Sequence, residues 1–437
     1  MPSMNGQMAG ALDNIHPGLS QQEAIRLLLA PLDDLESQSD PYMAAAHLIN
    51  FPGDATEQAL LKLIDNSEQS QPRRLARRKA VEVLARLGCR EAIPAIGRCL
   101  ASDDTYLVEN AAFALKELNC QDVEIHATLA SLLEQTSQNQ RVLIQSLAAL
   151  QVEQALPSIQ KLQDADSPGV RGAAISAMAK LAGSREHLLQ LEELMFLPNQ
   201  MDRQSAIQDA IDAKAVELLP QILRTPVSPV FRMRALKALW PKEGGQSEQL
   251  NLFSALDSLI EDHPESLQLV HAYDHSPGNE FLVQEFFGTD FSRCYLALQT
   301  LRDRSAKELW PFLHKRWFDE ADNDYGAHYF FIRLFALLSD AWPEEARELI
   351  KLILQEAINT RRPQFMKSKP AAVLAISRLG FAYSPENFTA LLDPLVTSFW
   401  ECRYAAVMVA PQDALRVALK DPEPFVAARA RHALKDL

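Results

Sequence analysis

An internal repeat of about 31 residues constrains this chain more than any other feature. Residues 79–88 align with residues 110–119, and then with residues 142–151 and 173–182. Within each copy, apolar residues recur three positions apart, which is the spacing of one face of a helix. A second short apolar stretch follows each copy, for example at residues 91–100. Helix pairs of this length bury their apolar faces only by stacking on neighbours, so the sequence predicts an all-α solenoid, a superhelix of HEAT-like helix-pair repeats.

The repeats also predict how the chain is organised. Weaker copies continue to the end of the chain, at residues 43–51, 234–240, 293–301, 331–338, 371–380, 403–408 and 426–434. We expect a flexible tail at residues 1–17, regular repeats at residues 18–230, and less regular repeats at residues 231–437 that continue from them.

Charge and cysteine content exclude several classes of function. The formal net charge is −14, which argues against a nucleic-acid partner and an anionic membrane surface. No apolar run of about 18 residues is present, so we expect no membrane span. The five cysteines form no CxxC pair, which argues against a disulfide framework and a structural zinc site. These features, and a start that does not resemble a signal peptide, suggest the reducing cytoplasm.

One basic cluster, residues 73–79, carries four arginines and a lysine in an amphipathic helical pattern. It is either a solvated helix face or a docking patch for an acidic partner.

The second half of the chain differs in composition. All five tryptophans follow residue 230, and five of the ten histidines fall within residues 263–331. Either longer, less regular helices form a thicker core there, or an aromatic wall rich in histidine surrounds a ligand. The usual glycine-rich phosphate loops, nucleophile elbows and HExxH motifs are absent, which argues against the common nucleotide and hydrolase sites.

Three clusters are candidates for chemistry. The first is His271, Tyr273, Asp274 and His275, just before Pro277 and Gly278. The proline and glycine end any helix, so the cluster is expected at a helix end or in a loop. Its side chains are either solvated or face a ligand as acid and base groups, and without a third ligand we expect no metal.

The second cluster is Trp317 and Asp319, followed by Tyr325 and His328. A carboxylate beside a flat apolar wall suits a protonated pyrrole system, and burial beside Trp317 strengthens such a contact. Asp319 is therefore our candidate for the main ligand anchor. The alternative is a solvated acidic loop.

The third cluster is the basic run of Arg361 and Arg362, with Lys367 and Lys369. It either binds carboxylates or forms a solvated loop. If all three clusters fail, the next candidate is the segment at residues 400–403, which contains Trp400 and Glu401.

Residues 40–52, Asp-Pro-Tyr-Met-Ala-Ala-Ala-His-Leu-Ile-Asn-Phe-Pro, and the repeats that follow them resemble the HEAT-repeat class of phycobilin lyases, the E/F type. Within that class the resemblance is closest to the longer single-chain members that serve phycoerythrin, some of which are lyase-isomerases of cyanobacteria. It covers nearly the whole chain.

The resemblance implies a reaction. The protein would hold no permanent cofactor and would bind phycoerythrobilin, a linear tetrapyrrole, as a substrate. A cysteine of a phycoerythrin subunit, expected to be the α subunit, would add to ring A and form a thioether. A lyase-isomerase would also shift a double bond to give phycourobilin, and Asp319, Tyr273, Asp274 and His328 are the candidates for proton transfer.

The same resemblance suggests bilin contacts for the remaining candidates, which are Trp317, Tyr325, His271, His275, Arg361 and Arg362. Two alternatives remain open: a non-catalytic HEAT scaffold that binds protein partners, and a subunit that holds bilin only together with a second chain.

Overall fold

The computed structural model describes residues 18–240, 251–338 and 342–435, and all regular structure in these ranges is helical. The predicted all-α fold is therefore confirmed for them. The tail expected at residues 1–17 lies outside the described residues. The chain forms two compact units, one ending at Leu188 and one beginning at Leu189. The change in regularity expected near residue 230 thus falls inside the second unit.

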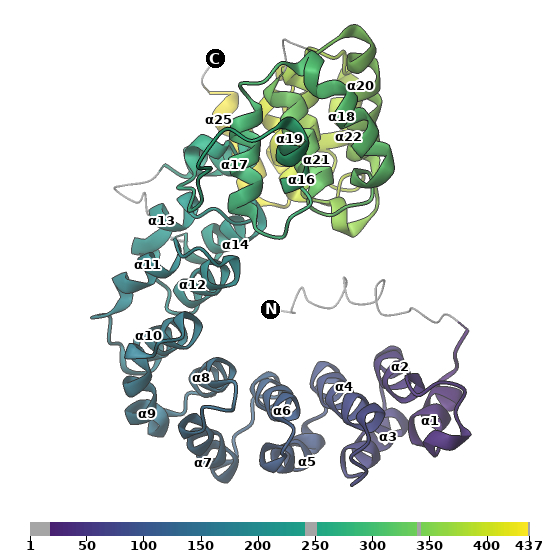
Figure 1. Cartoon of the computed structure of the whole chain (residues 1–437), viewed down its shortest axis with the longest axis vertical. Helices are drawn as coiled ribbons and strands as arrows, with labels where there is room; N and C mark the ends of the chain where they lie inside the picture. The colour runs from purple at the N-terminus through teal and green to yellow at the C-terminus, as the bar shows by residue number, and fades with distance from the viewer. Residues whose placement is uncertain (1–17, 241–250, 339–341, 436–437) are drawn as a thin grey trace. The chain divides into compact units, whose positions relative to one another are not determined.

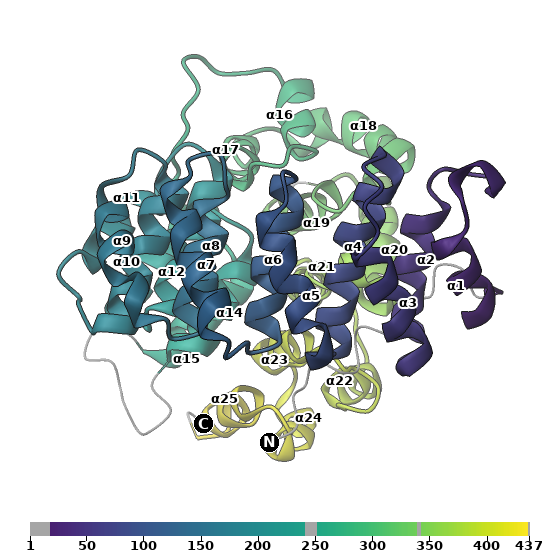
Figure 2. The same cartoon turned by 90° about the horizontal axis from the view of Figure 1, so that it is seen from below.

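The first unit consists of two rows of helices (Figure 1). In one row each helix packs on the next: α2 (Asp40–His47), α4 (Gln71–Leu87), α6 (Thr105–Glu117), α8 (Gln140–Ala149) and α10 (Pro168–Ala182). The companion helices are α1 (Gln21–Leu29), α3 (Asp54–Ile64), α5 (Ile93–Arg98), α7 (Val123–Ser131) and α9 (Leu156–Lys161). Helices α4 and α6 lie side by side in both Figure 1 and Figure 2.

The repeat in the sequence explains this packing. Two sets of equivalent apolar positions are buried in the first unit: Val81, Ala112, Ile144 and Ile175, and Leu84, Leu115, Leu147 and Met178. A left-handed residue ends the helix once per repeat, at Gly88, Asn119, Gln151, Gly183 and Lys214. Small residues such as Ala111 let neighbouring helices approach closely.

The basic cluster of α4 is largely structural, so both predicted alternatives, the solvated face and the docking patch, are wrong for Arg73 and Arg77. Arg73 is 2% exposed and donates to the carbonyls of Leu28, at 2.7 Å, and Ala30. Arg77, also buried, donates to the carbonyls of residues 66 and 68, both at 2.9 Å. These guanidinium groups satisfy carbonyls near the ends of α1 and α3, which would otherwise lack partners.

The second unit begins with two more helix pairs: α11 (Leu191–Leu194) with α12 (Gln200–Asp212), and α13 (Leu219–Arg224) with α14 (Pro229–Leu239). A second row of successively packed helices follows: α17 (Phe291–Leu301), α19 (Ala327–Leu337), α21 (Ser368–Arg378), α23 (Trp400–Val409) and α25 (Pro424–Ala433). Its companions are α16 (Asn279–Glu285), α18 (Ala306–Arg316), α20 (Glu344–Asn359), α22 (Pro385–Leu392) and α24 (Gln412–Leu415). Every weak repeat predicted beyond residue 230 falls on α14 or in this row.

Helix α15 (Leu252–Glu261) departs from the repeat pattern because it packs on α14 and also on α21 and α23. Asp257 of α15 accepts hydrogen bonds from Tyr404 at 2.8 Å and from Arg429 at 3.0 Å. Lys237 of α14 forms an ion pair with Glu423 at 2.8 Å. The last helices of the chain are therefore held by contacts to helices more than 140 residues earlier. Segments from distant parts of the sequence, α14, α15, α19, α21 and α23, border one cavity.

Candidate functional site

The first predicted cluster lies in the loop between α15 and α16, and the structure separates its members. His271 is fixed in the middle of this loop, because its Nε2 lies 3.0 Å from the Asp290 carboxylate, which also binds Arg203. Asp274 and His275 are exposed. The prediction that this cluster lies at a helix end or in a loop is confirmed, but its side chains do not converge on one point.

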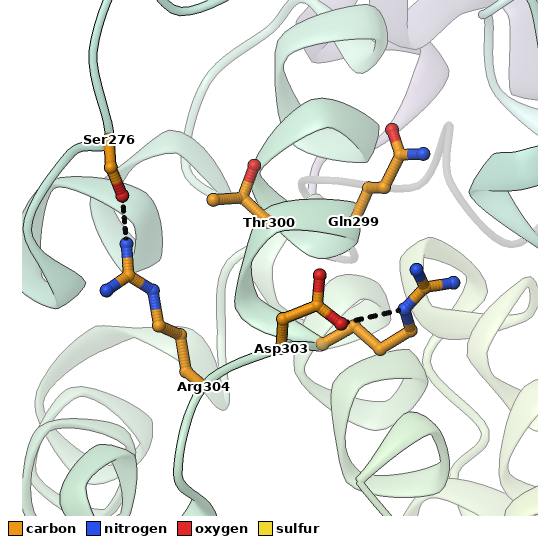
Figure 3. A pocket seen from close by; sticks show the side chains of 6 residues that line it. Ser276, Gln299, Thr300, Asp303 and Arg304 are labelled. Atoms are coloured by element: carbon orange, nitrogen blue, oxygen red, sulfur yellow. Dashed lines mark hydrogen bonds and ion pairs between the residues drawn. The ribbon is translucent and has the colours of Figure 1, made fainter.

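The far end of this loop is fixed by Arg304. Its Nη2 donates to the Ser276 hydroxyl at 2.6 Å and to the Pro277 carbonyl at 3.0 Å. Figure 3 shows this contact beside a polar hollow lined by Thr300, Asp303 and other residues from the end of α17. The hollow has no apolar wall that suits a tetrapyrrole, so the contact of Arg304 with this loop is structural.

Tyr273 is the one member of the first cluster with an unusual environment. Its ring packs edge-on against Phe281 at 6.0 Å, and its hydroxyl is buried without a hydrogen-bond partner among the described residues. Burial raises the pKa of Tyr273, and the charge of Glu285 adds to the effect. The hydroxyl therefore keeps its proton at neutral pH and is available as a donor.

The second predicted cluster divides between a buried and an exposed face. Residues Trp317–Ala321 form a single π-helical turn, a feature that is frequent at functional sites. Trp317 is 5% exposed and packs against His328 and Phe331. Asp319 is exposed, so the expected burial of its carboxylate beside Trp317 is wrong. Residues two apart on a helix do not face the same side, and Asp319 as a bilin anchor stays a prediction that has lost this support.

His328 lies between two aromatic side chains. Its ring stacks on Phe365 at 4.2 Å and contacts Trp317 at 5.2 Å, and its Nδ1 lies 2.9 Å from the Ser368 hydroxyl. Burial, with the positive charges of Lys367 and Arg362, lowers the pKa of His328 to about 4. The imidazole is therefore neutral at physiological pH.

The third predicted cluster also divides. Arg361 and Arg362 are exposed, and Arg362 donates to the Asn323 side chain at 3.3 Å. Lys367, five residues later, is 6% exposed. Its Nζ lies 3.4 Å from the ring centroid of Tyr325, a predicted bilin contact that is itself half exposed. The structure thus gathers Trp317, Tyr325, His328 and Arg362 around the start of α21.

Sequence reasoning grouped Lys367 with the basic run and missed its burial. The ammonium also lies 4.7 Å from the Phe291 ring centroid and 5.3 Å from that of Tyr329. Such cation–π contacts replace part of the lost hydration. No described residue accepts a hydrogen bond from its Nζ, and burial lowers the pKa of Lys367 to about 7.

A buried polar network lies next to this region. Asp262 accepts hydrogen bonds from Arg232 at 2.5 Å, from Tyr295 at 2.6 Å and from Tyr329. Arg333 donates to the Tyr329 hydroxyl at 2.9 Å, and its other nitrogens donate to backbone carbonyls at the end of α15. Burial opposes ionisation of Asp262, but the two arginines together hold its pKa below the ordinary value. The network fixes α14, α15, α17 and α19 relative to one another.

A small apolar cavity, with a free volume of about 40 Å³, lies beside this network. Its lining comes from α14, α15, α19, α21, α23 and the residues just before α21 and α23: Pro229, Val230, Met233, Leu259, Ile260, Tyr329, Arg333, Lys367, Pro370, Phe399 and Glu401. Glu401 is the second lining residue, after Lys367, that has an unusual environment. Its Oε2 is buried without a hydrogen-bond partner among the described residues, and burial raises the pKa of Glu401 to about 7.

The lining of this cavity, though not its volume, matches the usual anatomy of a small-molecule site, which is apolar with a few converging polar groups. Its reactive side chains come from sequence regions that were noted separately, Lys367 in the basic run and Glu401 in the fallback segment. Only the fold brings them to one cavity. Among the residues that the structure describes, no group of three or more potential metal ligands gathers.

The helix-pair architecture places the chain in the class of HEAT-repeat proteins. A family model described as a PBS lyase HEAT-like repeat matches residues 76–102, within α4 and the helices that follow it. Bilin biosynthesis protein CpeY of Synechococcus sp. (strain WH8020) is 44% identical over 411 residues, which cover 91% of this chain and 98% of that protein. Phycocyanobilin lyase subunit alpha of Thermosynechococcus vestitus is 30% identical over 204 residues, which cover 42% of this chain and 72% of that protein.

The chain therefore belongs to the family of HEAT-repeat phycobilin lyases, as its opening segment and repeats predict. A solved structure, the complex of CpcE and CpcF of phycocyanin lyase from Nostoc sp. PCC7120, is similar to 59% of this chain with a TM-score of 0.47 and 24% sequence identity, and all of that chain is covered.

Proposed function

We propose that this protein is a bilin lyase that joins phycoerythrobilin through a thioether to a cysteine of a phycoerythrin subunit. The observation that carries the proposal is the extent of the match to CpeY, which spans 98% of that protein. A shared HEAT repeat alone indicates only a fold, because HEAT repeats serve many functions. A match over both units includes the cavity region as well as the repeats.

The chain's own thiols support a reaction in which the substrate protein provides the nucleophile. All five cysteines are buried and unpaired. Burial raises the pKa of Cys89 and Cys99 to about 11 and that of Cys402 to about 12, and it also raises the pKa of Cys120 and Cys294. Thiols of this kind are inert, so an incoming cysteine is the reactive one.

The cavity in the second unit is our proposed site for ring A of the bilin. Its free volume of about 40 Å³ is well below the usual range for ligand pockets, about 300–1,000 Å³. It has room only for the edge of one ring, so the rest of a linear tetrapyrrole would lie outside it. Ring A carries only small apolar substituents and a lactam, whereas the two propionates belong to the central rings. An apolar cavity therefore favours ring A at its mouth and the propionates farther out.

Isomerisation to phycourobilin stays a prediction, as does the assignment of Tyr273, Asp274, Asp319 and His328 to proton transfer. Within that set, the structural environment favours Tyr273, whose buried hydroxyl is protonated and lacks a partner. His328 is buried and neutral, and Asp274 and Asp319 are exposed. None of the four lines the cavity, so each would reach bilin only outside it.

A phycobiliprotein subunit is the natural partner of a lyase of this family, and we propose the α subunit of phycoerythrin. No helix among the described residues is long and apolar enough to cross a membrane. The unpaired cysteines favour the reducing cytoplasm.

Co-expression tests the proposal. The chain is produced together with enzymes that make phycoerythrobilin and with either the α or the β subunit of phycoerythrin. A lyase gives a subunit that keeps its bilin absorbance and fluorescence on a denaturing gel, because the thioether is covalent. A non-catalytic scaffold gives no colour on either subunit. A further arm adds a second lyase chain, and colour that appears only in that arm would indicate a subunit that acts with a partner.

A further inference from the structure

Two ionisable side chains of opposite kind face the cavity in the second unit. Lys367 immediately precedes α21, and Glu401 lies in the first turn of α23. Both are largely withdrawn from solvent, and neither Lys367 Nζ nor Glu401 Oε2 has a hydrogen-bond partner among the described residues. Buried polar atoms are normally paired, so each exception calls for an explanation.

Other buried charged residues of this unit have ion-pair partners, whereas Lys367 and Glu401 have none among the described residues. Arg403, two residues after Glu401, forms a two-pronged ion pair with Asp421 at 2.6 and 2.8 Å. Arg232 forms a single ion-pair contact with Asp262, at 2.5 Å, within the network beside the cavity. These structural charges have ion-pair partners, whereas Lys367 Nζ and Glu401 Oε2 lack hydrogen-bond partners among the described residues and belong to side chains that line the cavity.

We infer that Lys367 and Glu401 are the proton donor and proton acceptor for the addition of the substrate cysteine to ring A of the bilin. The inference rests on the proposed function and names the residues that would carry out its chemical step.

The step balances without any further reactant. The S–H bond of the incoming thiol breaks, and its proton passes to the carboxylate of Glu401. Sulfur bonds to the exocyclic carbon of the ring A ethylidene group, the carbon–carbon double bond becomes single, and the adjacent ring carbon takes a proton from the ammonium of Lys367. One proton then moves from Glu401 to Lys367, directly or through solvent, and restores both groups.

The electrostatic surroundings suit both roles. Burial is the main cause that lowers the pKa of Lys367 to about 7, and the carboxylates of Asp324 and Asp262 oppose this effect. Burial also raises the pKa of Glu401 to about 7, with Lys237, Glu423 and Arg403 as the charged groups nearby. An acid and a base work best when their pKa values lie near the working pH.

Two conservative variants test the inference. Lys367→Arg keeps the positive charge but holds its proton too tightly to act as an acid, and Glu401→Gln keeps the shape but cannot accept a proton. Lys369→Met is the control, because Lys369 lies two residues from Lys367 and does not line the cavity. Purified full-length protein, phycoerythrobilin and the apo-subunit are mixed, bilin binding is followed by absorbance, and thioether formation is followed on denaturing gels.

We expect both variants to bind phycoerythrobilin within about twofold of wild type and to form the thioether about 100-fold more slowly, in the range of general acid–base catalysis. The control keeps the wild-type rate. In the pH profile of wild type, activity falls below the pKa of Glu401 and above that of Lys367. Glu401→Gln should remove the acidic limb, and Lys367→Arg should remove the alkaline limb.

A thioether rate within twofold of wild type in either variant would overturn the role assigned to that residue. Loss of bilin binding by a variant with unchanged circular dichroism and thermal midpoint would also overturn it, since the residue would then be an anchor. Failure of the proposed function itself looks different, because wild type would then form no thioether with any subunit.

Discussion

The two units are built from the same helix pairs, yet they use polar residues in different ways. In the first unit, buried arginines bind nearby backbone: Arg73 reaches the end of α1, the longest such link at 45 residues. In the second unit, side chains join positions 87 to 186 residues apart, as in Arg203 with Asp290 and Lys237 with Glu423. The cavity of the second unit lies where α15 packs on α14 and also on α21 and α23. The difference teaches that contacts between distant segments, added to the stacking of neighbours, border this cavity.

The tryptophans make this comparison measurable. All five lie between residues 240 and 400, within the second unit, so their fluorescence reports the unfolding of that unit alone. Far-UV circular dichroism reports the helices of both.

The largest expected effect is on the second unit and comes from Asp262→Asn. Asparagine keeps the volume and tolerates the left-handed backbone, with φ of 46°, at this position. It removes the charge that compensates buried Arg232 and Arg333. Breaking a buried pair of this kind costs about 3–5 kcal/mol. The free energy of unfolding, measured with urea and followed by tryptophan fluorescence, should fall by that amount.

The pH dependence of wild type gives an independent check of the same network. Because the pKa of Asp262 is lowered in the folded state, its stabilising contribution is complete above the unfolded pKa, about 3.9. It is lost as the pH falls through the folded value. If neither Asp262→Asn nor a lower pH shifts the unfolding transition seen by tryptophan fluorescence, the stabilising role of this network is contradicted.

A smaller effect is expected in the first unit from Arg73→Met. The methionine fills part of the space but leaves carbonyls of Leu28 and Ala30 without their donor. Such a loss costs about 1–3 kcal/mol. The loss should appear in circular dichroism and not in tryptophan fluorescence. Arg74→Met is the matched control, because Arg74 has only a 3.2 Å contact with exposed Asp103. Equal effects of the two substitutions would restore the view of this cluster as a solvated face.

Tyr273→Phe should leave stability unchanged, because the hydroxyl that it removes has no partner among the described residues. If Tyr273 donates a proton during transfer or isomerisation, bilin binding is kept while chromophore attachment slows about threefold, a loss of about 0.7 kcal/mol of transition-state stabilisation. The absorbance of the product after co-expression measures both steps, since phycourobilin and phycoerythrobilin absorb at different wavelengths. Unchanged yield and colour would remove Tyr273 from the site.

The smallest effect is expected from Asp319→Asn. If Asp319 is the main bilin anchor, as predicted from the sequence, its neutralisation should lower chromophore transfer at least tenfold. That loss equals about 1.4 kcal/mol of transition-state stabilisation. A site in the cavity instead predicts less than a twofold change, because Asp319 is exposed on the π-helical turn. The yield of coloured subunit decides between them. A tenfold loss would move the bilin from the cavity to the surface around residues 317–321.

The parts of the fold that follow from local periodicity were predictable. Val81 and its equivalents repeat at a fixed spacing, and a helix face follows directly from that spacing. Helix α12 was missed because its sequence, Gln-Met-Asp-Arg-Gln-Ser-Ala-Ile-Gln-Asp-Ala-Ile-Asp, is mostly polar. Part of that polarity is used inside the unit, where buried Arg203 binds Asp290.

The candidate site was predictable only in pieces. The opposite faces of Trp317 and Asp319 follow from helix geometry and were open to sequence reasoning. The cavity that Lys367 and Glu401 share was not. Neighbouring repeats place α21 beside α23, but the cavity also needs α15 to pack on these helices, and no local pattern specifies that contact. Burial then gives these two residues their unusual protonation, which the residue types alone do not indicate.

The account's central claim is that bilin binds in the cavity of the second unit, and hydrogen exchange with and without phycoerythrobilin tests it most directly. The helices that line the cavity should gain protection when bilin is added: α14, α15, α19 and α23, with the start of α21. Helices α2 to α10 of the first unit should exchange as before. Protection confined to the first unit, with the cavity helices unchanged, would contradict the account.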